Sequence, residues 1–187
     1  MIGCAIETLA TEGYAQASLA HIAQRAQVSK SAITYYFSSK DELLKQVVIE
    51  VYKSAAAYIG PRVGAQSGAA ERLRAYIEAH VEYISRHLTE MMALAEIGLN
   101  ARTADGTPPL AGLTGEPALD PLIRLLRQGQ AAGEFRDFDA RVVAITIRRA
   151  IDGTSRLLIG HPDLDVDHYT RELVTLFDCA TRKANEA

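Results

Sequence analysis

The chain has 187 residues, of which 48% are hydrophobic and 23% are charged, and its formal net charge is −3. This length suits one ordinary domain, or a small domain joined to a larger one. A charge so close to neutral excludes a surface coated by nucleic acid, but it permits DNA contact on one small face. Charged residues interrupt every apolar stretch well before the roughly 18 residues of a membrane span, which predicts a cytoplasmic protein with no membrane partner.

Helix is the secondary structure that the sequence favours throughout. Thirty residues are alanine, the strongest helix former. In the N-terminal part, apolar residues recur at helical spacing over 2–12, from Ser18 to Ala26, from Ser29 to Tyr36, and again from Ser38 to Val51. Gly13 is placed to end the first of these helices, and Ser18 and Ser29 are placed to cap the next two. Four helices are therefore predicted before residue 52.

The rest of the chain is predicted to form longer helices. Glycine and proline at 60–61 and glycines at 64 and 68 predict a break, and helical spacing returns over 71–87, 91–99, 119–132, 140–159 and 165–182. Residues 100–121 hold four of the six prolines and three glycines, which predicts a loop, partly helical at most, that is either a lid or disordered. The fold class is therefore all-α, with about nine helices and no strand.

One segment has the layout of a helix-turn-helix. Residues 18–37, SLAHIAQRAQVSKSAITYYF, consist of two short helices, a turn at 26–28, and a second helix that begins at a hydroxyl residue. The predicted core between the two helices contains Leu19, Ile22, Ala23, Val28 and Ile33. The opposite face of the second helix has side chains that can reach base edges or phosphates in a major groove, namely Lys30, Ser31, Thr34 and Tyr35.

This segment resembles the tetracycline-repressor (TetR) family of transcriptional regulators. The resemblance rests on Gly13-Tyr14, on Ile22-Ala23 and on residues 28–43, VSKSAITYYFSSKDEL. It implies a helix-turn-helix DNA-binding domain at 1–45 and a helical ligand-binding and dimerisation domain at 46–187. The implied DNA-binding residues are Ser18, for a phosphate; Ser29, Lys30, Ser31, Thr34 and Tyr35, for the groove; and Tyr36 and Lys40, for the DNA backbone. Phe37 is assigned to the core.

Simpler roles compete with these assignments. Tyr35, Tyr36 and Phe37 are alternatively packed aromatics, and Lys40 is alternatively a solvated cap residue.

The segment also departs from the family pattern. Gln27 stands where the family usually places glycine, so either Gln27 adopts positive φ or the turn has another geometry. Ser31 stands where glycine is frequent, and Thr34 where an aromatic is frequent, so the base preference cannot be copied. Residues 1–45 have four Lys/Arg against four Asp/Glu. Because phosphate neutralisation dominates affinity, this balance indicates either weak DNA binding or basic residues upstream of Met1.

A small-molecule effector is the second partner that the resemblance implies. Polar and aromatic side chains beside the apolar face of the helix at 71–87 form the first candidate wall of its pocket, and residues of the next helix form the facing wall. A half-exposed helix edge, ordinary core methionines and a salt bridge are the competing interpretations. The candidate residues are Tyr76, His80, Tyr83, Met91, Met92, Glu96, Asn100, Arg149 and Asp152.

The predicted helices at about 140–159 and 165–182 have broad apolar faces, which predict a homodimer through a four-helix interface; the alternative is packing within one chain.

No phosphate-binding loop, nucleophile elbow, zinc motif or paired Glu-x-x-His occurs, so we expect no enzyme activity, no cofactor and no metal site. The sequence thus predicts a ligand-responsive regulator, a repressor that a small molecule releases from double-stranded operator DNA. The alternative is a helical interaction or ligand-binding module without DNA binding.

Overall fold

The computed structural model describes residues 1–102 and 116–183, with side chains described from 118 in the second range. These residues form nine α-helices and one short 3-10 helix, and no strand, which confirms the predicted fold class. In chain order the helices are α1 (Ile2–Glu12), η1 (Tyr14–Gln16), α2 (Leu19–Arg25), α3 (Lys30–Tyr36), α4 (Lys40–Gly64), α5 (Ala69–Arg86), α6 (Leu88–Asn100), α8 (Glu116–Ala131), α9 (Ala140–Gly160) and α10 (Val166–Thr181). None of the helices in the described ranges combines the length and apolarity that a membrane crossing needs.

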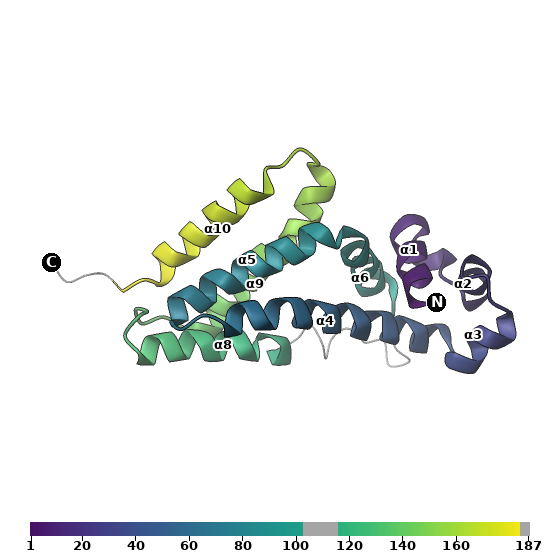
Figure 1. Ribbon diagram of the computed structural model, residues 1–187, viewed down its shortest axis with the longest axis horizontal. Helices are drawn as coiled ribbons and strands as arrows, with labels where there is room; N and C mark the ends of the chain where they lie inside the picture. The colour runs from purple at the N-terminus through teal and green to yellow at the C-terminus, as the bar shows by residue number, and fades with distance from the viewer. Residues whose placement is uncertain (103–115, 184–187) are drawn as a thin grey trace. The chain divides into compact units, whose positions relative to one another are not determined.

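The described helices group into two compact units. The first, here called the head unit, contains residues 1–54 and α6; the second, here called the bundle unit, contains residues 55–86 with α8, α9 and α10. Within the head unit, Figure 1 shows α1, α2 and α3 next to one another, with α6 beside α1. The predicted boundary after residue 45 separates DNA binding from ligand binding and dimerisation, and it stays a prediction.

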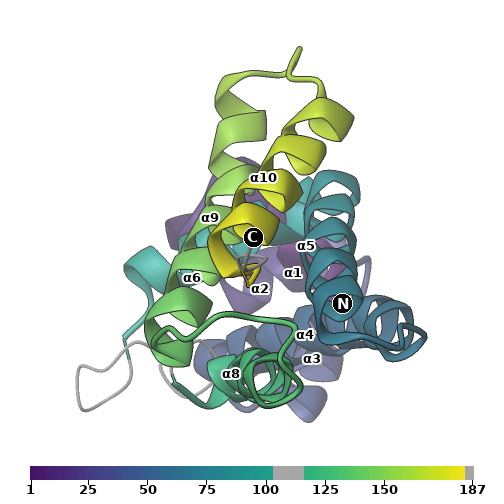
Figure 2. The same cartoon turned by 90° about the vertical axis from the view of Figure 1, so that its left-hand side faces the viewer.

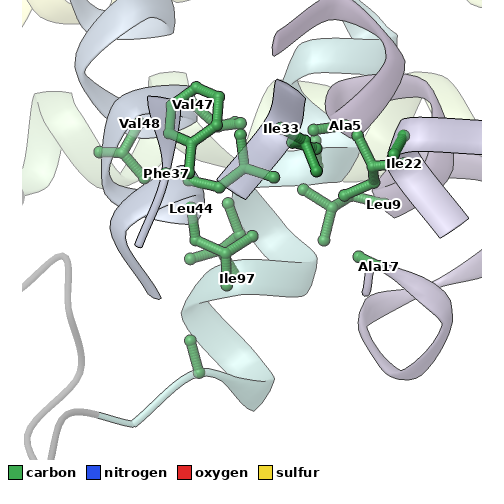
Figure 3. Close-up of a cluster of buried hydrophobic side chains, with 14 residues drawn as sticks. Ala5, Leu9, Ala17, Ile22, Ile33, Phe37, Leu44, Val47, Val48 and Ile97 are labelled. Carbon is green, nitrogen blue, oxygen red and sulfur yellow. The ribbon is translucent and has the colours of Figure 1, made fainter. Parts of the chain in front are cut away.

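The head unit is built around one apolar core. Side chains from α1, α2, α3, α4 and α6 point toward one another in Figure 3, and Leu44 of α4 and Ile97 of α6 lie close together. The core confirms the predicted inner positions Ile22, Ala23 and Ile33. Leu19 and Val28 are partly buried against it. Because α6 supplies Ala93 and Ile97 to this core, and Ala101 just after α6 adds to it, a helix from far along the chain completes the N-terminal fold.

The bundle unit has α5 at its centre. Figure 2 shows this unit, in which α5 packs against α8, α9 and α10. One wide face of α5 is apolar and buries Leu73, Ile77, Val81 and Ile84 among other residues, while Glu71, Arg74 and Glu78 stay exposed. The neighbouring helices contribute Leu122, Leu126, Ile147, Ile151, Leu173 and Phe177.

One predicted break is wrong. The helix that starts at Lys40 does not end at Gly60-Pro61 but runs through Pro61 to Gly64. Proline removes one backbone donor; here the loss falls in the exposed end of the helix, where the Arg62 guanidinium donates to the Tyr58 carbonyl (2.8 Å) and lies over the Tyr58 ring. The predicted loop at 100–121 is helical at both ends, because α6 includes Asn100 and α8 begins at Glu116 and contains Pro121. The rest of that prediction, 103–115, lies outside the described residues.

A tight turn joins α8 to the segment before α9. The Gly129 carbonyl accepts hydrogen bonds from the N–H groups of Glu134 (2.9 Å) and Phe135 (3.1 Å), while Gly133 adopts a φ of +75°. The Glu134 carboxylate then accepts from the backbone N–H groups of Ala69 and Ala70, both at 3.0 Å, and so caps the N-terminus of α5. These backbone hydrogen bonds hold the pKa of Glu134 below its usual range.

Gly129 is a position where the turn requires the absence of a side chain. A β-carbon there would overlap the buried Phe135 ring and the Ala69 methyl group. We expect Gly129→Ala to lower the free energy of unfolding by about 1–3 kcal/mol, because the ring must shift within a packed core. Urea unfolding followed by circular dichroism measures the change. Gly3→Ala is the control, because Gly3 has open space around it in α1 and alanine favours a helix, so this variant should be at least as stable as the parent.

Candidate functional site

Two serines fix the ends of the helix-turn-helix. The Ser18 hydroxyl oxygen accepts a hydrogen bond from the N–H of His21 (3.2 Å), and the Ser29 hydroxyl oxygen accepts one from the N–H of Ala32 (3.0 Å). Both serines have extended backbone and lie at the N-cap positions of α2 and α3. The two predicted caps are confirmed. Each serine is exposed, so it occupies the start of its helix with its hydroxyl accessible to solvent.

The turn between α2 and α3 resolves the choice that the sequence left open. Gln27 has a φ of 55°, so a residue other than glycine adopts the left-handed conformation. The N–H of Gln27 donates to the carbonyl of Gln24 (3.1 Å), and the N–H of Val28 donates to the carbonyl of Ala23 (3.0 Å). The turn therefore keeps the geometry of the helix-turn-helix at the cost of some backbone strain at Gln27.

One face of α3 is polar and open to solvent. Ile33 is fully buried and Phe37 is 8% exposed, which confirms their assignment to the core. By contrast, Tyr35 is 83% exposed and Tyr36 is 61% exposed, so the interpretation of these two tyrosines as packed aromatics is wrong. Their rings meet edge to face with centroids 5.2 Å apart. The exposed side chains of this face also include Lys30, Ser31 and Thr34.

The hydroxyl groups of this face are already oriented. The Ser29 and Ser31 oxygens lie 2.9 Å apart. The Thr34 hydroxyl donates to the carbonyls of Lys30 (2.9 Å) and Ser31 (3.2 Å), which leaves its lone pairs and its methyl group toward solvent. A threonine held in this way can accept from a base amino group or contact a thymine methyl.

Several cationic side chains of the head unit bind partners within the protein. Arg25 pairs with Glu12 (2.6 Å) and Glu7 (3.3 Å). The Lys40 ammonium donates to the Tyr14 carbonyl (2.6 Å) and lies 3.7 Å from the centroid of the Tyr14 ring. Burial lowers the pKa of Lys40, an effect that the Asp41 carboxylate opposes. On α3, Lys30 is exposed and has no ion-pair partner among the described residues.

A polar cluster lies between α5 and α9 of the bundle unit. The rings of Tyr76 and His80 are 4.0 Å apart between centroids, and His80 Nδ1 lies 2.7 Å from the Tyr76 carbonyl. Arg148 Nε donates to Asp152 Oδ1 (2.8 Å), and the Arg148 guanidinium interacts electrostatically with the Tyr76 side chain. The cluster brings together three predicted effector residues, but the arginine in it is Arg148 rather than Arg149, which is exposed.

The other effector candidates lie elsewhere. Tyr83 is buried and packs against Tyr58, with ring centroids 5.7 Å apart. Met91 and Met92 are half-buried on α6 in the head unit. Glu96 of the same helix accepts a hydrogen bond from the N–H of Tyr14 (2.9 Å), and the Asn100 amide lies 3.2 Å from the same carboxylate oxygen. The partner that a carboxylate in an apolar helix requires is therefore the protein backbone. No local pattern indicates this contact, because it joins residues 82 positions apart.

These features define an all-α protein of the helix-turn-helix class. The family profile described as "Bacterial regulatory proteins, tetR family" matches residues 2–47, which include the whole helix-turn-helix. The chain is 29% identical, over 144 residues, to the HTH-type transcriptional repressor NicS of Pseudomonas putida, a match that covers 73% of this chain and 65% of that repressor.

Solved structures share the complete fold. A bacterial regulatory protein of the tetR family from Rhodococcus RHA1 has a TM-score of 0.81 at 22% identity, and covers 98% of this chain and 96% of its own. The fatty acid degradation regulator FadR from Bacillus halodurans has a TM-score of 0.81 at 20% identity, with 94% and 90% covered. The match to the tetR family of bacterial regulatory proteins covers residues 2–47, and the likeness to these solved structures shows a shared fold.

The buried imidazole of the α5–α9 cluster predicts a specific acid sensitivity. Burial, reinforced by the Arg148 charge, lowers the pKa of His80 from 6.5 to about 4. Between these values the unfolded chain binds more protons than the folded one, so stability falls as the pH drops from 6.5 to about 4. We expect His80 to account for about 2–3 kcal/mol of this loss. Chemical denaturation at pH 7.5, 5.5 and 4.5 measures it.

The matched variants are His80→Gln and His161→Gln. His80→Gln should flatten the pH dependence of unfolding over this range, because the titrating group is gone. His161 is exposed, and its replacement should leave the dependence as in the parent. The assignment fails if His80→Gln has the same acid sensitivity as the parent.

Proposed function

We propose that the chain is a ligand-responsive, sequence-specific DNA-binding transcriptional regulator that represses its targets until a small molecule releases it from the operator. The observation that carries the proposal is the exposed face of α3, where hydroxyl groups, Lys30 and two exposed tyrosines stand on a helix fixed by a buried core. The match to a transcriptional repressor supports the direction of regulation. A regulator of DNA in a bacterium would act in the cytoplasm.

Within this proposal the residues of the face divide into two kinds of contact. Thr34, Ser31 and Tyr35 would read base edges in the major groove, since they occupy the exposed side of the second helix. Ser18, Ser29, Lys30 and Tyr36 would bind phosphates, with the first two at helix N-termini where backbone donors favour an anion. Phosphate contacts set the register of the protein on the duplex, and base contacts select the sequence.

The proposed active form is a homodimer through α9 and α10. In the single chain, Val142, Ile145 and Ile159 of α9 are 57%, 38% and 49% exposed, and Leu176 of α10 is 60% exposed. Large apolar side chains left in water on two adjacent elements of the sequence favour burial against a second copy. A two-fold dimer would also supply the second head that binding to successive major grooves, about 34–36 Å apart, requires.

The effector is proposed to bind near the polar cluster of α5 and α9. Tyr76, His80 and Asp152 already gather there around Arg148, so the bundle contains hydrogen-bonding groups in apolar surroundings. A ligand that binds better to the conformation unable to span two grooves would release the DNA.

DNA recognition is tested by titrating the protein against a fluorescent duplex from the region upstream of its own coding sequence, with a scrambled duplex as control, at two salt concentrations. We expect salt-sensitive binding that prefers the native duplex. Equal, weak binding to both duplexes would contradict the proposal and favour the interaction module. Lys30→Met should reduce the slope of log affinity against log salt by about 2 for a dimer, because two phosphate contacts are lost.

Base readout is tested separately with Thr34→Ala. This change removes a hydroxyl and a methyl from the proposed groove face, so we expect altered preference among duplexes that differ by single base pairs, by about 1–3 kcal/mol at the affected position. The salt dependence should stay that of the parent, since threonine neutralises no phosphate. A uniform loss for all duplexes would rule out base contact by Thr34.

Dimerisation is tested with Leu176→Glu. A buried charge in the proposed interface should convert the dimer to a monomer at micromolar concentration, measured by sedimentation velocity. Gln128→Glu adds the same charge at an exposed position of α8 and should remain dimeric. A Leu176→Glu protein that stays dimeric would place the interface elsewhere.

A further inference from the structure

The backbone of Tyr14 is a junction between three elements of the head unit. Its N–H donates to Glu96 Oε2 of α6 at 2.9 Å, and its carbonyl accepts from Lys40 Nζ of α4 at 2.6 Å. The Lys40 ammonium also lies 3.7 Å from the centroid of the Tyr14 ring. One residue of η1 thus joins an acid from α6 to a base from α4, through its two backbone polar groups and its ring.

The residues of this junction flank the helix-turn-helix on both sides in the sequence. Tyr14 lies four residues before the cap residue Ser18, and Lys40 lies three residues after Phe37. The Tyr14–Lys40 contact therefore joins the two ends of the motif. Closing a segment in this way removes the freedom of its ends to separate, so α2 and α3 are held at one spacing.

The backbone conformation of Gly13 orients the Tyr14 N–H toward the Glu96 carboxylate. Gly13 has a φ of 84° and a ψ of 171°, a conformation essentially restricted to glycine, and it ends α1 just before Tyr14. A β-carbon on Gly13 would come within 3.6 Å of Glu96 Oε2. The reversal at Gly13 thus presents the Tyr14 N–H to the carboxylate, and a charged acceptor makes this hydrogen bond a strong one.

We propose that Lys40 and Glu96 are positioning residues for DNA binding, which act through Tyr14. In this account Lys40 holds the start of α4 to η1 and does not neutralise a DNA phosphate, in contrast to the role that the family resemblance implies. Glu96 fixes the junction to α6 and is no part of the effector pocket. This inference rests on the proposed DNA binding, and it concerns which residues act on DNA indirectly.

Salt dependence separates a positioning lysine from a phosphate-binding one. A lysine that neutralises a phosphate releases counterions when DNA binds, so its loss reduces the slope of log affinity against log salt. A lysine that only orients the motif contributes affinity without that slope. Lys30, exposed on α3 without an ion-pair partner in the described chain, is the matched comparison for Lys40.

The experiment measures affinity for the preferred duplex at four salt concentrations in the parent, Lys30→Met, Lys40→Met, Glu96→Ala, Glu96→Gln and the double variant Glu96→Ala/Lys40→Met. We expect Lys40→Met and Glu96→Ala each to weaken binding about tenfold with the parental salt slope. Glu96→Gln should recover most of the loss, because an amide oxygen still accepts from Tyr14. The double variant should lose much less than the product of the two single losses, since both act on one junction.

Amide hydrogen exchange provides a readout apart from DNA. The Tyr14 amide should exchange faster in Glu96→Ala than in the parent or in Glu96→Gln, while amides in the bundle unit keep their rates. Thermal unfolding confirms that each variant is folded at the assay temperature. If Glu96→Ala is unfolded at that temperature, Glu96→Gln replaces it in the comparison.

Three results would overturn the inference: a salt slope that falls in Lys40→Met as much as in Lys30→Met, parental affinity in Glu96→Ala, or fully multiplicative losses in the double variant. Failure of the proposed function is a different result, in which the parent itself shows no preference for any duplex.

Discussion

The burial of a small apolar core in the head unit is the constraint on which the rest of the recognition face depends. Ile22 of α2 and Ile33 of α3 are fully buried in this core, with Leu44 of α4 and Ile97 of α6. Helices as short as α2 and α3 are unstable alone, because so few hydrogen bonds repay their nucleation. Packing therefore supplies their stability, and their outer faces remain available for polar side chains.

The same core explains why the exposed tyrosines are informative. Phe37 directly follows Tyr36 in the sequence, yet it is buried while Tyr35 and Tyr36 stand in solvent. An aromatic ring left in water gains nothing from the hydrophobic effect, so two adjacent ones on a capped helix indicate a surface that is completed by another molecule. The apolar side chains exposed on α9 and α10 indicate the same for the bundle unit, with a second copy of the chain as the proposed partner.

Local features of this fold are readable from the sequence. The caps Ser18 and Ser29 follow from rules that span only a few residues, and the left-handed conformation of Gln27 was one of two alternatives that the sequence left open. The helical run through Pro61 was missed because proline was given more weight than the helix formers around it. The sequence analysis names Arg149, whereas the cluster contains Arg148, because a shift of one position turns a helical side chain by about 100° to another face.

The contacts of Lys40 and Glu96 were beyond local rules. Each reaches Tyr14 from a distant part of the chain, 26 and 82 residues away, so no spacing predicts it. The family resemblance implies that Lys40 binds the DNA backbone, and Glu96 was assigned to a ligand because a carboxylate in an apolar helix needs a partner.

The most direct test of sequence-specific recognition by α3 is selection of DNA by the dimer from a random pool of duplexes. The account predicts enrichment of a two-fold symmetric site whose half-sites lie about one helical turn apart. It also predicts that Thr34→Ala enriches a site changed at the same position in both halves. A pool that shows no enriched sequence under conditions of measurable binding would contradict the account.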